Sequence, residues 1–272
     1  MTITYNCTSD DQRAEGLQHA KRAISEKKCI VIPTDTVYGI AADAFSPTAV
    51  TLLLASKGRS RQMPPPVLIP RINALDGLAT EVPADARALA QALWPGGLTL
   101  ILHAQPSLDW DLGETKGTVA LRMPDDPIAL DLLGMTGPLA VSSANRTGQE
   151  PAQTAAEARL QLAESVEVYL EGGFRPIEGT AAVPSTIVDA TSTPFRVVRQ
   201  GAIELERLRE IVPSILGFGE AVGQEAPVGE APTQEPPVEE LPGQDVAGPD
   251  VEGPVHGSDP VAANGEVKPD DS

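Results

Sequence analysis

The sequence predicts one α/β domain followed by a C-terminal tail of different composition. Short apolar runs typical of buried strands alternate with segments whose apolar residues recur every three or four positions, as on one face of a helix. The chain has 272 residues, of which 41% are hydrophobic, enough for one large domain or two small ones. Interleaved strands and helices indicate a sheet with helices packed on it.

The first predicted elements are a helix, a strand and a second helix. Asp10 or Asp11 can cap the first helix, whose apolar residues share one face. The run Ile30–Ile32 fits a buried strand. Ser46 and Pro47 form a typical helix start, a capping side chain followed by a proline in the first turn.

The remaining body continues this alternation. Further strands are predicted at 98–102, 119–122, 138–141, 166–170, 186–188 and 195–198. Further helices are predicted near 84–93, 126–133, 154–163 and 203–212. Thr154 and Glu157 form a capping-box pattern at the start of the third of these helices.

The charge is strongly negative and unevenly distributed. The chain carries 38 acidic and 20 basic residues, a net charge of -18, which argues against a protein that coats DNA or an anionic membrane. Residues 1–219 hold 25 acidic and 19 basic residues. A locally basic pocket in that body is therefore compatible with the composition.

The C-terminal segment is predicted to be a disordered acidic tail. From residue 220 onward there are 13 acidic residues, 9 prolines, 7 glycines, no aromatic residue and a single base, Lys268. So few apolar side chains do not offset the entropy of ordering the backbone. We therefore divide the chain into a folded body, 1–216, and a tail, 217–272, which either solvates the protein or binds a basic partner.

The cysteines and histidines predict neither a disulfide framework nor a metal site. Cys7 and Cys29 have no disulfide or zinc spacing, and none of His19, His103 and His256 has a partner at ligand spacing. The chain start lacks a basic region followed by an apolar run, and no segment reaches the roughly 18 apolar residues of a membrane span. We expect a cytoplasmic protein with free thiols and no membrane contact.

Polar side chains follow two of the predicted strands and indicate a binding site. Pro33–Gly39 follows the first strand, and Ser142–Asn145 follows the strand at 138–141. Lys57 and Arg59 follow the second helix, where Gly58 permits a tight turn, so both cations can reach one polyanion. The same residues can instead cap a helix or form turns. Neither a Walker loop nor a Rossmann fingerprint is present.

The order of several motifs resembles that of the YrdC-like threonylcarbamoyl-AMP synthases over roughly residues 14–212. The motifs are Pro33–Gly39, Lys57-x-Arg59, Trp94–Thr99, Leu121–Pro124, Ser143-x-Asn145, Ser185–Asp189 and Arg199-x-Gly201. The resemblance implies a single YrdC-like domain, a twisted mixed sheet flanked by helices with a basic concave cavity. The chain would be the short form of the family, with an acidic extension.

The resemblance also implies the reaction. L-threonine, bicarbonate and ATP would condense into threonylcarbamoyl-AMP and pyrophosphate, with Mg2+ accompanying ATP as the cofactor. A downstream tRNA threonylcarbamoyl-transfer enzyme would then modify the adenosine next to the anticodon. The intermediate needs a sheltered, basic cavity.

Site residues follow from the resemblance position by position. The residues that would bind the ATP phosphates or the nucleotide are Lys57, Arg59, Thr118, Ser143, Asn145 and Arg199, with Lys57 and Arg59 as the catalytic pair. The residues that would bind L-threonine are Thr36, Arg122 and Ser185. No protein metal ligand is implied.

Some motif residues keep two interpretations, and one segment departs from the family. Asp35 and Tyr38 fit either substrate contact or a turn and a bonded core ring, while Trp94–Gly97 is expected to be a structural turn. The proline-rich loop 60–68 places Met63 and Leu68 where they can contact substrates.

Two alternative functions belong to the same family of folds. One is a YrdC-like module that binds double-stranded RNA or tRNA without synthesis, which the acidic charge and the 3% aromatic content disfavour. The other is a hydrogenase-maturation domain, for which the chain lacks the cysteines and the length.

Overall fold

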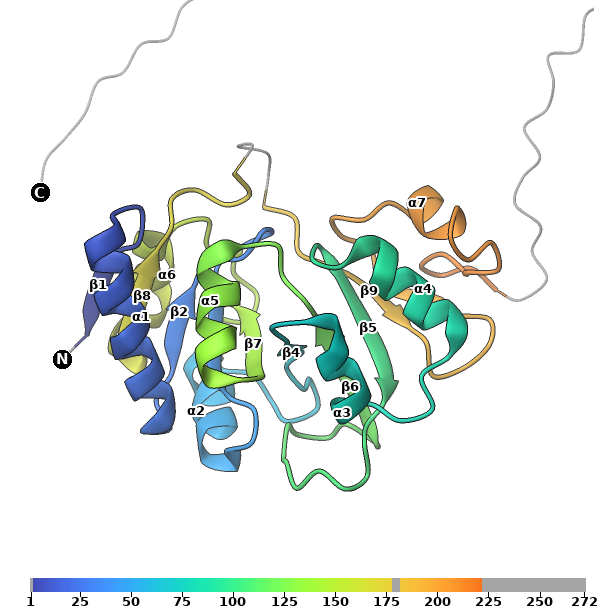
Figure 1. The fold of residues 1–272 in the computed structure, drawn as a ribbon, viewed down its shortest axis with the longest axis horizontal. Helices are drawn as coiled ribbons and strands as arrows, with labels where there is room; N and C mark the ends of the chain where they lie inside the picture. The colour runs from blue at the N-terminus through green and yellow to red at the C-terminus, as the bar shows by residue number, and fades with distance from the viewer. Residues whose placement is uncertain (1, 178–181, 222–272) are drawn as a thin grey trace, which may run out of the picture. The chain divides into compact units, whose positions relative to one another are not determined.

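The structure is a computed structural model that describes residues 2–177 and 182–221. Its centre is a mixed sheet whose strands lie in the order β1-β8-β2-β3-β7-β4-β6-β5-β9-β10, with helices on both sides (Figure 1). The strands are β1 Ile3–Asn6, β2 Ile30–Ile32, β3 Gly39–Asp43, β4 Val67–Leu68, β5 Leu98–His103, β6 Thr118–Arg122, β7 Leu139–Ser143, β8 Val168–Glu171, β9 Thr186–Asp189 and β10 Arg196–Arg199. The predicted α/β fold is confirmed.

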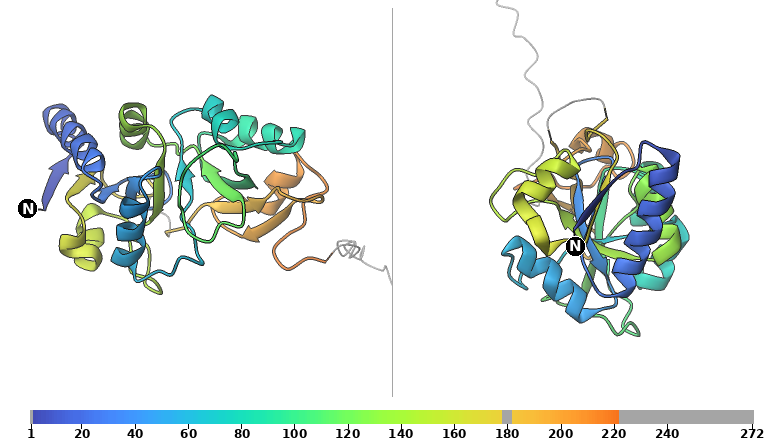
Figure 2. Two further views of the ribbon diagram at one scale, coloured as in Figure 1. Left: turned by 90° about the horizontal axis from the view of Figure 1, so that it is seen from below. Right: turned by 90° about the vertical axis from the view of Figure 1, so that its left-hand side faces the viewer.

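Helices pack against both faces of the sheet. They are α1 Asp10–Ser25, α2 Pro47–Lys57, α3 Leu75–Leu78, α4 Ala84–Leu93, α5 Pro127–Thr136, α6 Ala155–Leu162 and α7 Leu205–Arg209, with short 3-10 turns at Ile72–Ala74 and Ala163–Ser165. Near β2, helices α1 and α5 cover one face and α2 and α6 the other (Figure 2). Within the described residues, no helix is long and apolar enough to cross a membrane.

Side-chain alternation along β2 produces two hydrophobic cores. Ile30 and Ile32 belong to the cluster that contains Leu17 of α1 and Leu132 of α5. Val31 belongs to the second, larger cluster, which also contains residues of α2, α4 and α6. Successive side chains of a strand point to opposite faces, so β2 is buried on both. This explains its unbroken apolar sequence.

Side-chain caps fix the starts of three helices, two of which, those of α2 and α6, the sequence predicts. The Ser46 side chain accepts a hydrogen bond from the Ala49 backbone N–H at the start of α2, and Thr154 accepts one from the Glu157 N–H at the start of α6. Asp126 caps α5 through bonds from two backbone N–H groups. The predicted cap of α1 is wrong: the helix begins at Asp10, so the N-cap position falls on Ser9.

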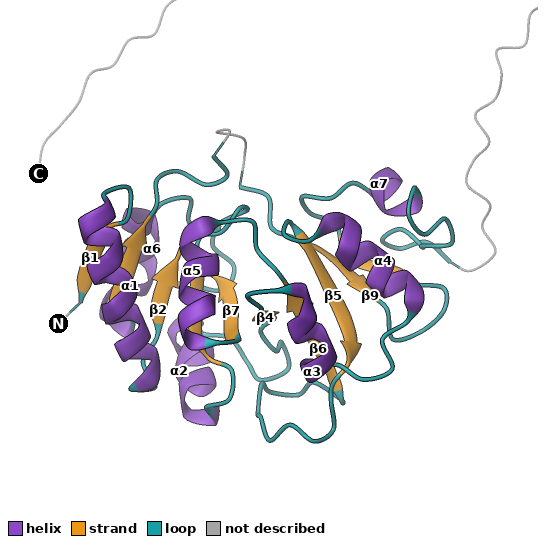
Figure 3. Ribbon diagram, in the orientation of Figure 1, coloured by secondary structure: helices purple, strands orange, loops and turns teal. Residues whose placement is uncertain are grey.

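Three strands and one helix were not predicted. Strands β1, β3 and β4 and helix α3 lie in segments for which no element was predicted. Figure 3 labels β1, β4 and α3. β4 is only two residues long and follows three prolines, yet it pairs with β6 and β7. Its neighbours supply the hydrogen-bonding partners that its own sequence does not signal.

Contacts with the folded body continue past residue 216, its predicted end. The Glu220 carboxylate accepts hydrogen bonds from the Gly217 backbone N–H and from the Arg209 guanidinium, at 2.8 and 2.6 Å. Residues 222–272 of the predicted acidic tail lie outside the described residues.

Candidate functional site

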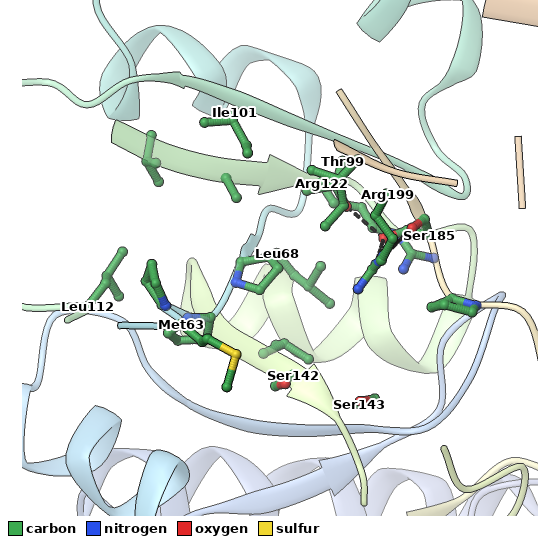
Figure 4. A pocket seen from close by; sticks show the side chains of 18 of the residues that line it. Met63, Leu68, Thr99, Ile101, Leu112, Arg122, Ser142, Ser143, Ser185 and Arg199 are labelled. Carbon is green, nitrogen blue, oxygen red and sulfur yellow. Dashed lines mark hydrogen bonds between the residues drawn. The ribbon is translucent and has the colours of Figure 1, made fainter. Parts of the chain in front are cut away.

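A cavity of about 330 Å3 lies along the half of the sheet that runs from β7 to β10. Its wall is built by residues of β4, β5, β6, β7, β9 and β10, together with the loop 34–37 and the proline-rich loop 63–66. Figure 4 shows Arg122, Arg199 and Ser185 gathered at one end, while Met63 and Leu112 lie at the other. The cavity therefore has a cationic end and an apolar end.

The cavity wall is cationic although the chain is acidic. Three arginines, Arg59, Arg122 and Arg199, line it, and none of the described residues that line it is a carboxylate. Burial, Arg122 and Arg59 together lower the pKa of Arg199 to about 10, and burial lowers the pKa of Arg59. Such shifts mark cations that lack compensating negative charge. An anionic ligand would supply it.

Arg122 is held by three protein acceptors. Its Nε donates to the Gly96 carbonyl at 3.0 Å, and its two terminal nitrogens donate to Thr36 Oγ1 at 3.0 Å and to Asp35 Oδ1 at 2.6 Å. Asp35 Oδ1 also accepts from the Asp125 backbone N–H. Asp35 therefore supports Arg122, a role that neither of the two interpretations given above includes.

The Trp94–Gly97 segment is a structural turn, as predicted. The Trp94 indole N–H donates to the Leu98 carbonyl at 2.7 Å, and the Gly96 N–H donates to the Met123 carbonyl at 2.8 Å. The turn also presents the Gly96 carbonyl to Arg122.

Arg199 and Ser185 form a second supported group at the cationic end. The Arg199 guanidinium donates to the Ser185 carbonyl and, at 2.9 Å, to the Ser185 hydroxyl. That hydroxyl also shares a 2.8 Å hydrogen bond with the Thr99 hydroxyl. Thr99 was not predicted as a site residue, although it closes the Trp94–Thr99 motif.

Arg59 reaches the cavity beside the end of β7. One terminal nitrogen donates to the Ser142 hydroxyl at 2.9 Å. Its Nε is buried without a hydrogen-bond partner among the described residues. Ser143 and Thr118 also line the cavity, as do Met63 and Leu68 of the segment 60–68.

The structure does not bring Lys57 and Asn145 to the cavity lining. The buried Lys57 ammonium donates to the Ser143 carbonyl, to the Asn145 carbonyl and to Asn145 Oδ1. Tyr38 is likewise a buried core ring, whose hydroxyl lies 2.6 Å from Glu171 Oε1 and accepts from the Gly172 N–H.

The motif order alone does not distinguish wall residues from the residues behind them. Of the predicted site residues, those on the wall are Thr36, Arg59, Thr118, Arg122, Ser143, Ser185 and Arg199. Among the residues that the structure describes, no group of three or more His, Cys, Asp or Glu side chains is arranged to hold a metal ion.

Comparisons with known proteins identify similar sequences and folds. The Sua5/YciO/YrdC family model, described as "Telomere recombination", matches residues 22–201. A Mycobacterium tuberculosis protein, provisionally named threonylcarbamoyl-AMP synthase, is 48% identical over 212 residues, which cover 78% of this chain and 96% of that protein. The threonylcarbamoyl-AMP synthase of Bacillus subtilis is 33% identical over 210 residues, 76% of this chain and 58% of the relative.

A solved structure also resembles this chain. The crystal structure of Pyrococcus abyssi Sua5 complexed with L-threonine superposes with a TM-score of 0.73 at 30% identity. The match covers 83% of this chain and 66% of that one.

Proposed function

The chain belongs to the Sua5/YciO/YrdC family, and we propose on that premise that it is a threonylcarbamoyl-AMP synthase. It condenses L-threonine, bicarbonate and ATP into threonylcarbamoyl-AMP and pyrophosphate. The observation that carries the proposal is a cavity whose described lining contains three arginines and no carboxylate. An amino acid carboxylate and a triphosphate are anions that arginines bind. Arg122 already pairs with Asp35, whereas Arg59 and Arg199 have no carboxylate partner among the described residues.

The cationic end suits L-threonine. Arg122 keeps two of its five N–H donors after its three protein contacts, so it can pair with the substrate carboxylate. Thr36 and Ser185 place hydroxyls on the same wall, where they can bond the substrate's hydroxyl. The threonine complex of the Pyrococcus abyssi relative supports this choice of substrate.

ATP occupies the rest of the cavity in this proposal. Arg59, Arg199, Ser143 and Thr118 face its phosphates and ribose, and the apolar end near Met63 and Leu112 shelters the adenine (Figure 4). Mg2+ would accompany the phosphates of ATP, as it commonly does at sites that bind nucleotides. The ion would neutralise the leaving pyrophosphate.

The chemistry has two steps. The threonine amine adds to carbon dioxide derived from bicarbonate and loses a proton, which gives a carbamate. A carbamate oxygen then attacks the α-phosphorus of ATP, a P–O bond forms, and the bond to pyrophosphate breaks. Arg59 and Arg199 stabilise the charge that develops on the phosphates.

We propose that a downstream enzyme transfers the threonylcarbamoyl group of the product to tRNA in the cytoplasm. Direct contact of this chain with tRNA or double-stranded RNA is the alternative function. The names of the relatives and the acidic charge do not favour it.

Component omission tests the proposal. Pyrophosphate release is measured with ATP, magnesium, bicarbonate and L-threonine, and with each omitted in turn. We expect release only in the complete mixture. Release at the same rate without threonine would sink the assignment, and salt-dependent RNA binding without synthesis would favour the alternative.

A further inference from the structure

The Lys57 ammonium is satisfied by protein atoms alone. It has three N–H donors, and these meet three acceptors: the carbonyl of Ser143, the carbonyl of Asn145 at 2.6 Å and Asn145 Oδ1 at 3.2 Å. Only 3% of Lys57 is exposed. Burial and Arg59 lower the pKa of Lys57 to about 8, so the side chain is mainly charged at neutral pH and can donate all three bonds.

The Asn145 side chain is also fully used inside the protein. Its Nδ2 donates to the carbonyls of Arg146 and Gln149, at 2.9 and 2.7 Å, while its Oδ1 accepts from Lys57. The Thr147 backbone N–H adds a bond to the Lys57 carbonyl at 2.9 Å. These contacts tie the segment after β7 to the C-terminal end of α2.

A turn at Gly58 separates the directions of Lys57 and Arg59. Gly58 ends α2 with φ 62°, in the left-handed region that favours glycine. On one side of this turn Lys57 lies behind the Ser143–Asn145 segment; on the other, Arg59 lines the cavity and donates to the Ser142 hydroxyl.

We infer that Lys57 and Asn145 are positioning residues: they fix the Ser143 hydroxyl and the Arg59 guanidinium relative to each other, and they do not contact the nucleotide. We call this pair the loop latch. The inference rests on the proposed function only for the identity of the anion. Contact of Lys57 with a phosphate would require it to break bonds to buried acceptors, each of which costs free energy when left unpaired.

The test compares the loop latch with Arg59. In the full-length protein we would measure urea unfolding without ligand, pyrophosphate affinity by calorimetry, and the KM values for ATP and threonine. The variants are Lys57→Met, Asn145→Ala, their double variant and Arg59→Met. The latch variants should lower the urea midpoint without ligand, and the double variant should lower it by less than the sum of the two.

The kinetic parameters separate a positioning role from a purely structural one. At a temperature where every variant is folded, each latch variant should raise KM for ATP and leave KM for threonine unchanged. A purely structural role would leave both values unchanged and would overturn the inference. Arg59→Met should weaken pyrophosphate binding about 10- to 150-fold. It should lower the urea midpoint less than the latch variants do.

Other outcomes would also contradict the loop latch. If Lys57→Met keeps the wild-type urea midpoint and loses pyrophosphate affinity as Arg59→Met does, Lys57 is a direct ligand. If Lys57→Met fails to fold, Asn145→Ala still tests the inference, because in that variant Lys57 keeps its two backbone acceptors, the carbonyls of residues 143 and 145. If wild-type protein binds no pyrophosphate, the proposed function fails, whereas the unfolding measurements still test the latch.

Discussion

At the residue scale, the orientation of Arg122 depends on a carboxylate behind it. Asp35 accepts from Arg122 and from the Asp125 backbone N–H, while Thr36 and Gly96 accept from the other two guanidinium nitrogens. A planar guanidinium held at three points presents its remaining donors in a fixed direction. Asp35 should therefore control threonine affinity without touching threonine.

Asp35→Asn tests this dependence. Because a hydrogen bond to a charged group contributes about 1.5 to 3 kcal/mol, its weakening should raise KM for threonine about tenfold. KM for ATP should stay near its wild-type value. Asp125→Asn is the matched control, since the exposed Asp125 contacts Asp35 through its backbone. An equal rise in both KM values would mean that Asp35 supports the whole cavity.

The sequence indicates which residues lie near the site, but not which of them line the cavity and which lie behind its wall. Arg59 and Lys57 are two positions apart in one motif, yet only Arg59 lines the cavity. The difference arises from the left-handed turn at Gly58. A glycine at this position makes such a turn possible, but the sequence does not show in which direction the side chains on either side of it point. Thr99 was not predicted because its role depends on the hydrogen bond between its hydroxyl and that of Ser185, which lies 86 positions away in the sequence.

At the element scale, helix α5 is anchored by a buried ion pair. The Asp126 carboxylate caps the helix through Oδ1 and accepts two bonds from Arg175 through Oδ2, at 2.9 and 2.8 Å. The exposed fractions of the two residues are 1% and 5%. The pair joins α5 to the segment after β8.

Asp126→Ala should be strongly destabilising. It leaves a buried guanidinium without its partner and two N–H groups without their cap, so we expect a loss of about 3 to 5 kcal/mol in the free energy of unfolding. Thr154→Ala, which removes only the cap of α6, should cost about 1 kcal/mol. Urea unfolding measures both. Equal losses of unfolding free energy in the two variants would mean that the ion pair with Arg175 adds no stability beyond that of a helix cap.

Elements with strong local signals were predictable, whereas those formed by their neighbours were not. β2 and α2 carry a clear apolar pattern and a cap. β3 has the sequence Gly-Ile-Ala-Ala-Asp and becomes a strand because β2 and β7 pair with it on either side. Tertiary pairing of this kind leaves little trace in local propensity.

At the scale of the whole molecule, the structure provides a more precise boundary for the folded body. Glu220 contacts Arg209, Gly217 and Arg196, so a boundary at residue 216 removes contacts of the body. Among the described residues, those that line the cavity all precede residue 200. Stability and activity should therefore respond differently to truncation.

Two truncations make this difference measurable. A chain ending at Ala221 should keep the wild-type melting temperature and threonine-dependent synthesis, although it loses 12 acidic residues and Lys268. A chain ending at Leu216 should melt at a lower temperature, because it also lacks Glu220. If the chain that ends at Ala221 unfolds or loses activity, residues 222–272 contribute to the stability or activity of the folded body.

Stability should also fall in alkaline solution because of a buried thiol. Burial raises the pKa of Cys29 from 9.0 to about 12. Above pH 9 the unfolded chain loses this proton while the folded chain retains it, so the thiol lowers stability by about 1.4 kcal/mol per pH unit. Urea unfolding between pH 8 and 10.5 should show a flatter fall for Cys29→Ala. If the free energy of unfolding falls equally steeply with pH in Cys29→Ala and in the wild type, the Cys29 thiol is not a cause of the alkaline loss of stability.

The central claim is the synthesis of threonylcarbamoyl-AMP in this cavity. Its most direct test is mass spectrometry of the intact product, formed from ATP, magnesium, L-threonine and bicarbonate labelled with carbon-13. We predict an adenylate that contains threonine and gains one mass unit from the label. Release of AMP or pyrophosphate with no product carrying both threonine and the labelled carbon would contradict the claim.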